Sequence, residues 1–127
     1  MGVRGQVSVL IADDNGFFRE ALEAILQTED EIQVIGRAGD GEEAARLAAE
    51  LEPDVILMDL SMPVLDGFEA TRAINDRVPE AAVVVLTGSA EPSDIERARQ
   101  AGAAAYVTKD RIAAELVDAI LAAASRP

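Results

Sequence analysis

The chain has 127 residues, of which 50% are apolar and 3% aromatic, so it is long enough for one domain, residues 1–127, with an aliphatic core. Its formal net charge of −13 argues against direct nucleic-acid binding by this segment and against adhesion to an anionic membrane, because it cannot neutralise phosphates over a broad face. The absence of cysteine and histidine excludes disulfides, zinc fingers and catalysis by either side chain, which leaves carboxylates, hydroxyls, backbone groups and a hard metal for any chemistry.

Strand-like apolar runs alternate with helical patterns along the chain. The five runs cover residues 7–12, 32–38, 55–58, 82–86 and 105–107. The first, third and fourth are almost continuously apolar, which is typical of central strands covered on both faces. The second carries Gln33 and Arg37, and the fifth is short and rich in alanine, so both suit the edges of a sheet.

Helical patterns fill the segments between these runs. In four of them residues of one helical face are apolar, apart from Thr71: Phe18, Leu22, Ile25 and Leu26; Ala44, Leu47, Ala48 and Leu51; Phe68, Thr71 and Ile74; Ile112, Leu116, Ala119 and Ile120. Three helix starts carry a cap residue three positions before a glutamate: Asp40 with Glu43, Asp66 with Glu69, and Ser93 with Glu96. The helix near Ser93 has one large apolar residue, Ile95, so we expect it and the loop 88–92 to be the most mobile regular part of the fold.

Five repeats of strand and helix predict an α/β fold, a doubly wound five-stranded parallel sheet with helices on both faces. The character of the strands and the right-handed crossover rule predict the order 2-1-3-4-5, which is the flavodoxin-like (βα)5 arrangement. In such sheets the ligand site lies at the carboxyl ends of the strands, beside the switch point between strands one and three.

The residues at those carboxyl ends are polar and chemically distinctive. They are Asp13 and Asp14 after the first strand, Asp59 after the third, Thr87 and Gly88 after the fourth, and Lys109 after the fifth. Lys109 is the only lysine of the chain. Four strands therefore deliver three carboxylates, one hydroxyl and one ammonium to the same edge of the sheet.

This edge needs a cation. Two carboxylates ~4 Å apart repel each other by roughly 4 kcal/mol at an effective dielectric constant near 20. The available ligands are hard oxygens, which favours Mg2+ over zinc, and Mg2+ held by few carboxylates typically takes phosphate oxygens in its open positions. Lys109, the Thr87 hydroxyl and the Gly88 amide suit the oxygens of a phosphoryl group, and a carboxylate is the candidate nucleophile.

The chain resembles the receiver domain of two-component response regulators over essentially its whole length. The residues that carry the resemblance are Asp13-Asp14, Val-Ile-Leu-Met-Asp59, Met62-Pro63-Val-Leu-Asp66-Gly67, Val-Val-Val-Leu-Thr87-Gly88 and Gly102-Ala-Ala-Ala-Tyr106-Val-Thr-Lys109. Each piece is weak alone, but the ordered combination is highly specific.

The resemblance implies a phosphoacceptor site built around Asp59. Asp59 would accept a phosphoryl group from a phosphohistidine on a partner sensor histidine kinase. Asp14 would bind Mg2+ directly and Asp13 mainly through water, with Asp59 and the backbone carbonyl of Ser61 as further metal ligands. A receiver of this kind is a signalling domain and not an enzyme, although it assists its own phosphotransfer and dephosphorylation.

The resemblance also implies a switch. Thr87, Lys109 and the Gly88 amide would bind the phosphoryl oxygens, and Tyr106 would turn inward when Thr87 moves toward the phosphate. The face built from helix four, strand five and helix five would then carry the signal. Dimerisation of phosphorylated chains through that face is a further expectation, although no apolar stripe demands it.

Two positions depart from the common family pattern. Lys109 is followed by Asp110 and not by proline, so we expect a trans peptide bond there, because a cis bond at a non-proline costs ~2.5–4 kcal/mol. This pairing resembles the LuxR-type branch, whose receivers precede a helix-turn-helix domain and control transcription. The chain is then an excised receiver or a stand-alone one. Gly88 replaces the more usual alanine.

Other functions stay open at this point. A haloacid-dehalogenase-type phosphatase also uses an aspartate and Mg2+, but it expects an acid where Ser61 stands. A receiver-like interaction module that is never phosphorylated would keep the fold without the chemistry. Taken singly, each of these residues also has a structural interpretation: Asp13 and Asp14 as helix caps, Asp59 as a turn-forming acid, Thr87 as a structural cap, Lys109 as a solvated charge and Tyr106 as edge packing. Their convergence is what favours the phosphoacceptor.

The chain shows no sign of a membrane or secretory destination. No apolar run approaches the ~20 residues of a membrane span, and the N-terminal residues lack the hydrophobic stretch of a signal peptide. With the absence of cysteine, these features predict a cytoplasmic protein.

Overall fold

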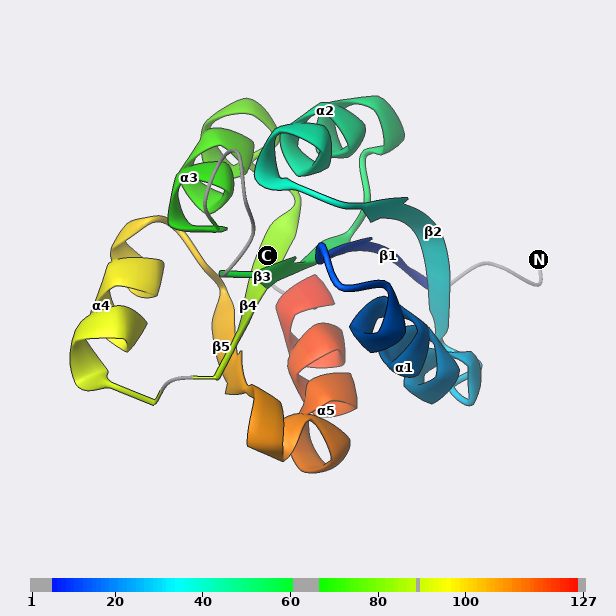
Figure 1. The fold of residues 1–127 in the computed structure, drawn as a ribbon. Coiled ribbons are helices and arrows are strands. Elements are labelled where there is room, and N and C mark those ends of the chain that lie inside the picture. The colour runs from blue at the N-terminus through cyan, green and yellow to red at the C-terminus, as the bar shows by residue number, and fades with distance from the viewer. Residues whose placement is uncertain (1–5, 61–66, 89, 126–127) are drawn as a thin grey trace.

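A computed structural model describes residues 6–60, 67–88 and 90–125 of the chain. Their strands form one parallel sheet in the order β2-β1-β3-β4-β5, which confirms the predicted topology (Figure 1). The strands are β1 (Val7–Ala12), β2 (Ile32–Ala38), β3 (Val55–Asp59), β4 (Ala82–Thr87) and β5 (Ala105–Thr108). The switch point lies between β1 and β3, which pair in parallel over Val9 to Ala12.

Helices cover both faces of the sheet (Figure 1). They are α1 (Gly16–Gln27), α2 (Gly41–Leu51), α3 (Gly67–Arg77), α4 (Pro92–Gln100) and α5 (Ile112–Ala124), with a 3-10 turn η1 (Lys109–Arg111) before α5. One layer holds α1 and α5, and the other holds α2, α3 and α4. No helix among the described residues is both long and apolar enough to cross a bilayer.

Two aliphatic cores lie on opposite faces of the sheet, because successive side chains of a strand point to opposite faces. Val9, Ile11 and Leu57 belong to the core under α1 and α5, whereas Leu10 and Ile56 belong to the core under α2, α3 and α4. All five of these side chains are fully buried. The cores fix both layers of helices on the sheet, and the sheet positions the residues at the carboxyl ends of its strands.

The strands β3, β4 and β5 each extend one residue beyond the predicted run. Asp59 still pairs with Leu86 of β4, and Thr87 still pairs with Thr108 of β5. The backbone of Asp59 and that of Thr87 are therefore held by strand pairing and not by a connecting loop. This register gives Asp59 and Thr87 defined places at the site.

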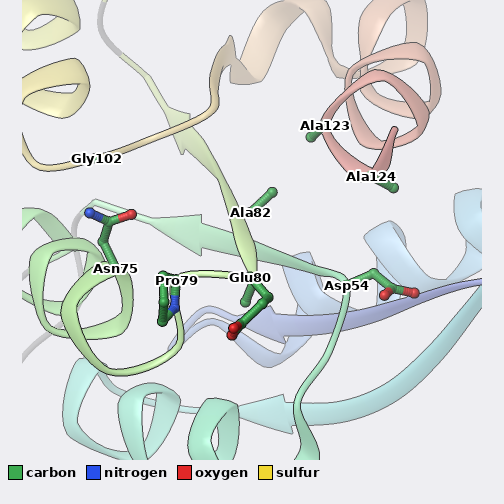
Figure 2. A pocket seen from close by; sticks show the side chains of 9 residues that line it. Asp54, Asn75, Pro79, Glu80, Ala82, Gly102, Ala123 and Ala124 are labelled. Carbon is green, nitrogen blue, oxygen red and sulfur yellow. The ribbon is translucent and has the colours of Figure 1, made fainter. Parts of the chain in front are cut away.

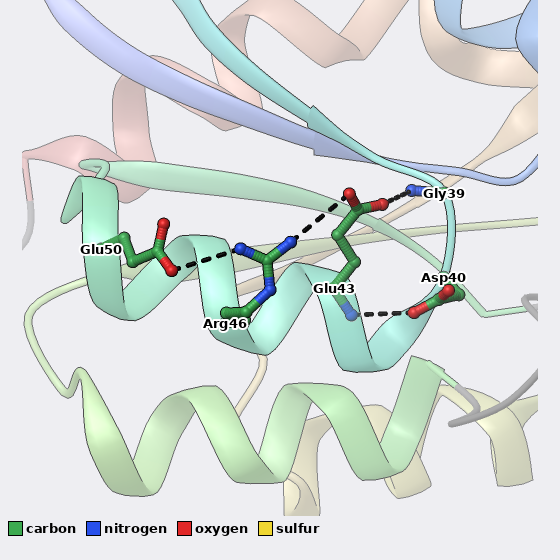
Figure 3. A network of polar contacts seen from close by, with 5 residues as sticks. All are labelled: Gly39, Asp40, Glu43, Arg46 and Glu50. Carbon is green, nitrogen blue, oxygen red and sulfur yellow. Dashed lines mark hydrogen bonds and ion pairs between the residues drawn. The ribbon is translucent and has the colours of Figure 1, made fainter.

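The start of α2 follows the predicted capping box (Figure 3). The Glu43 amide donates to Asp40 Oδ1 at 2.8 Å, and the Gly39 amide donates to Glu43 Oε1 at 2.8 Å. Arg46 extends the network, since its guanidinium lies 3.6 Å from Glu43 and 3.2 Å from Glu50. The predicted cap at Asp66 lies outside the described residues.

The start of α4 differs from the prediction. The helix begins at Pro92 with Glu91 as its N-cap residue, and Ser93 lies inside the first turn. Proline at the first helical position needs no hydrogen-bond partner for its nitrogen and has its φ angle already set, so it displaces a serine cap one residue later. No side-chain hydrogen bond caps this helix at Glu91.

Candidate functional site

Three aspartates converge at the carboxyl ends of β1 and β3. Asp13 and Asp14 directly follow β1, and Asp59 is the last residue of β3. One carboxylate oxygen of each lies within 4.8 Å of the others. Asp13 and Asp59 are buried, with 1% and 2% of their surface exposed, whereas Asp14 is exposed. Two buried anions and one exposed anion thus share a space that a single cation could fill.

Asp13 is the least satisfied member of the group. Its Oδ1 accepts a hydrogen bond from the Asn15 amide at 2.8 Å, but its Oδ2 is buried without a hydrogen-bond partner among the described residues. Burial raises the pKa of Asp13, and the neighbouring charge of Asp59 raises it further, against the Asn15 hydrogen bond and the charge of Lys109. An unpartnered carboxylate oxygen among hard oxygen donors fits a Mg2+ ligand set.

The loop after β1 is fixed by contacts within the first turns of α1. Asn15 caps that helix, because its Oδ1 accepts from the Phe18 amide at 3.0 Å. Arg19 Nη1 donates to the carbonyl oxygen of Asp13 at 2.6 Å. Asparagine before a helical pattern is a readable cap signal, whereas nothing in the sequence indicated the contact of Arg19.

Lys109 reaches the same space from the opposite side. It begins η1 directly after β5, and its Nζ lies 3.5 Å from Asp59 Oδ1. The ammonium also lies over the ring of Phe18, 4.6 Å from the ring centroid. No peptide bond of the described residues is cis, so the bond between Lys109 and Asp110 is trans, as predicted. The ring contact was not foreseen, because helical periodicity placed Phe18 in the core face of α1.

Thr87 and Tyr106 lie on neighbouring strands. Tyr106 is opposite Val85, and Thr87 is opposite Thr108 two residues further along the same face. Thr87 is buried and Tyr106 is partly buried. Burial raises the pKa of the Tyr106 hydroxyl, while a hydrogen bond with the Thr87 side chain lowers it. The two predicted switch residues are therefore in direct contact.

Two glycines border the site, and they differ in whether a larger side chain would fit. A Cβ atom at Gly67 would lie 2.5 Å from Leu60 Cα and 2.7 Å from the carbonyl oxygen of Asp59, closer than real Cβ atoms approach backbone. Gly67 therefore lets the start of α3 pack against the chain that follows β3. At Gly88, which is exposed, a Cβ atom would meet nothing within 4 Å. The predicted metal ligand Ser61 lies outside the described residues.

A separate hollow of about 380 Å3 lies at the opposite, amino-terminal edge of the sheet (Figure 2). Asp54 and Ala82 line it at the starts of β3 and β4, and Glu80 and Ala123 lie nearby. Asp54 is already engaged, because its Oδ2 accepts from the amide and the hydroxyl of Ser8 at 2.9 Å and 3.1 Å. The hollow contains none of the predicted site residues.

Comparison with known proteins identifies this architecture. The family model described as response regulator receiver domain matches residues 9–121. The transcriptional regulatory protein LiaR of Bacillus subtilis is 44% identical over 117 residues, which cover 92% of this chain and 56% of that protein. The chain thus spans about half the length of this curated relative.

Solved structures agree with the sequence comparison. A LuxR-family two-component response regulator from Aurantimonas superposes with a TM-score of 0.90 at 34% identity, covering 94% of this chain and 86% of that one. The receiver domain of a sensor histidine kinase from Pseudomonas aeruginosa, solved with a magnesium ion coordinated in its active-site cleft, gives 0.84 at 32% identity, covering 95% and 99%. These likenesses confirm the resemblance stated from the sequence motifs, including its LuxR-type branch. The chain belongs to the response regulator receiver domain family and is a module of two-component signalling.

Proposed function

We propose that Asp59 is a phosphoacceptor that takes a phosphoryl group from a sensor histidine kinase in a Mg2+-dependent reaction. The observation that carries the proposal is the convergence of Asp13, Asp14 and Asp59 within 4.8 Å, with Lys109 Nζ 3.5 Å from Asp59. A carboxylate oxygen of Asp59 would form a bond to phosphorus as the bond between phosphorus and the histidine nitrogen breaks.

The acid cluster fits a bound Mg2+ ion. Asp13, Asp14 and Asp59 would hold it, with the backbone carbonyl of Ser61 as the further ligand that the family resemblance implies. When bound, Mg2+ neutralises the clustered negative charge and that of an incoming phosphoryl group. Asp13 supports this role most directly, because its buried Oδ2 lacks a hydrogen-bond partner among the described residues.

The remaining residues of the site would bind the phosphoryl oxygens. Lys109 would shift its ammonium from the Asp59 carboxylate to a phosphoryl oxygen, a short move from its present place 3.5 Å away. The Thr87 hydroxyl and the Gly88 amide would donate hydrogen bonds. Thr87 would then give up its hydrogen bond with Tyr106, which passes the change to the surface formed by α4, β5 and α5.

The output of this switch would lie outside the chain. The relatives are about twice as long, and LiaR is named a transcriptional regulator. We propose that the chain controls transcription through a C-terminal helix-turn-helix domain of a longer cytoplasmic protein, and that phosphorylation favours a homodimer. The formal net charge of −13 supports DNA binding by another domain and not by this one. One phosphoryl group per Asp59, without multiple turnover, distinguishes this role from an enzyme.

Incubation with acetyl phosphate and Mg2+, followed by intact-mass spectrometry, tests the proposal. One added phosphoryl group is expected on the wild type and none on Asp59→Ala. Asp118→Asn, which changes an exposed acid of α5 and the net charge alone, should behave as the wild type. Absence of the adduct on the wild type supports the non-phosphorylated interaction module, and release of many phosphate equivalents per minute supports a phosphatase.

A further inference from the structure

The first turn of α1 presents an aromatic ring to the one lysine of the chain. Lys109 Nζ lies over the Phe18 ring at 4.6 Å from its centroid and 3.5 Å from Asp59 Oδ1. The ammonium is therefore held between a carboxylate and a π face. Phe18 is partly buried against the core under α1 and α5, so its ring has a fixed support.

We propose that Phe18 is a positioning residue for Lys109, which it holds where the ammonium meets the phosphoryl oxygens on Asp59. The inference rests on the proposed phosphoacceptor function and deepens it. A lysine side chain has a flexible four-carbon stem, and that of Lys109 is 34% exposed. Attraction between the ammonium and the face of the ring narrows the positions that this stem samples, since cation–π contacts act within about 6 Å of the centroid.

An aromatic ring suits this task better than an acid would. The first turn of α1 contains no acidic residue, so this turn adds no carboxylate to compete with a phosphoryl group for the ammonium. A π face attracts the cation without accepting its N–H groups in the way a carboxylate does. The ring thus keeps the Lys109 side chain beside Asp59, while its N–H donors remain available to oxygen.

The neighbouring Phe17 provides a matched control. It has the same side chain on the same turn of α1, but 88% of its surface is exposed. Substitution of Phe17 therefore changes the composition and helix propensity as substitution of Phe18 does, without removing the ring beneath Lys109.

A direct test uses the fact that Lys109 is the only lysine. Protein labelled with 13C-lysine gives a single ε-methylene signal, which the ring current of Phe18 should displace from the position of an unfolded chain. The displacement should persist in Phe18→Tyr and Phe17→Leu and should vanish in Phe18→Leu. An unfolded-chain position in the folded wild type would overturn the inference, whatever the fate of the phosphoacceptor proposal.

A functional test titrates beryllofluoride, a phosphoryl mimic, at saturating Mg2+ and monitors the same signal. Phe18→Leu should raise the half-saturating concentration about two- to fivefold, the factor that an exposed cation–π contact supplies. Phe18→Tyr should restore the wild-type value, and Phe17→Leu should keep it. Lys109→Met lacks the ammonium and its NMR signal, so its titration follows the fluorescence of Tyr106, the only tyrosine. In that background Phe18→Leu should not change the half-saturating concentration further.

The outcomes separate the two claims. Tight binding by the wild type with no difference between Phe18→Leu and Phe17→Leu overturns the role of Phe18 and leaves the phosphoacceptor in place. A loss in Phe18→Leu that Phe18→Tyr does not restore, or that persists undiminished in the Lys109→Met background, also overturns it. A wild type that binds no beryllofluoride overturns the proposed function and this inference with it.

Discussion

The side chains of Thr87 and Tyr106 share a hydrogen bond across the β4–β5 pair. Thr87 ends β4, one residue beyond the register partner of Asp59, whereas Tyr106 lies two residues before the register partner of Thr87 on the sheet-edge strand. A single contact thus joins the candidate site to the surface beside α4. Any ligand that draws the Thr87 hydroxyl toward Asp59 has to break or reshape this bond.

The titration of Tyr106 reports on that bond. Tyr106 is the only tyrosine and the chain has no tryptophan, so phenolate absorbance follows this one group. Burial raises its pKa above 10.0 and the hydrogen bond with Thr87 partly opposes the rise. Thr87→Ala should therefore raise the pKa further, and Thr87→Ser should keep the wild-type value. Because the fold disfavours the phenolate, the free energy of unfolding should fall above pH 10, more steeply in Thr87→Ala.

Asp13 should make the metal-free protein less stable at neutral pH. Burial raises the pKa of Asp13 above 3.8, so the folded state disfavours the ionised form. The resulting loss of stability is complete above the pKa of the folded state and disappears as the pH falls toward 3.8. Asp13→Asn should raise the free energy of unfolding at pH 7 by at least about 1 kcal/mol, which is the repulsion between charges ~4 Å apart at the dielectric constant of water and so a lower bound for a buried pair. Urea unfolding in a chelator should show this gain shrinking at lower pH. A variant Asp13→Asn that is less stable than the wild type at pH 7 would contradict the claim that the buried charge of Asp13 destabilises the metal-free protein.

Addition of Mg2+ should offset the destabilisation that the clustered carboxylates cause. A ligand that binds only the folded state stabilises it by about 2.7 kcal/mol at a hundred times its Kd, so the melting temperature of the wild type should rise with Mg2+. Asp13→Asn and Asp14→Asn should respond weakly, whereas Asp118→Asn on α5 should respond fully. An equal rise in all four proteins would indicate nonspecific screening of the acidic surface.

The two glycines at the site should respond oppositely to alanine. Gly67→Ala forces a methyl group against the backbone of Leu60 and Asp59 and should destabilise the protein by about 1–3 kcal/mol. Gly88→Ala meets open space and should be neutral or stabilising by up to about 1 kcal/mol, since it restricts the unfolded chain. Denaturant midpoints of both variants test the contrast, and equal losses would contradict it.

The amides of α4 should exchange faster than those of α5. Ala98 is the one residue of α4 that is buried, Ile95 is 39% exposed, and a mostly apolar hollow of about 170 Å3 lies between α4 and Tyr106 on β5. By contrast α5 buries Leu116 and Ile120 completely. Hydrogen exchange at neutral pH measures the difference, and protection of α4 equal to that of α5 would refute the expectation.

Much of this fold could be predicted from the sequence because its signals are periodic or local. The apolar runs predicted the strands, and the topological rule for parallel sheets predicted that Asp13, Asp59 and Lys109 meet at one edge. The cap pattern at Ser93 predicts the start of α4 wrongly, because the proline one residue earlier already begins the helix. The stacking of Lys109 on Phe18 could not be predicted, since it joins residues 91 positions apart and Phe18 also fits the core pattern of α1.

The sheet that divides the core also separates Asp59 from the two proposed switch residues, Thr87 and Tyr106. By strand alternation Asp59 continues the face that packs on α1 and α5, while Thr87 and Tyr106 continue the face that packs on α3 and α4. A phosphate donor that binds beside α1 would therefore leave α4 and Tyr106 uncovered. Of the proposed output surface, α5 shares a layer with α1, whereas α4 packs on the other face of the sheet, so the donor and a partner bound at α4 would occupy different faces of the molecule.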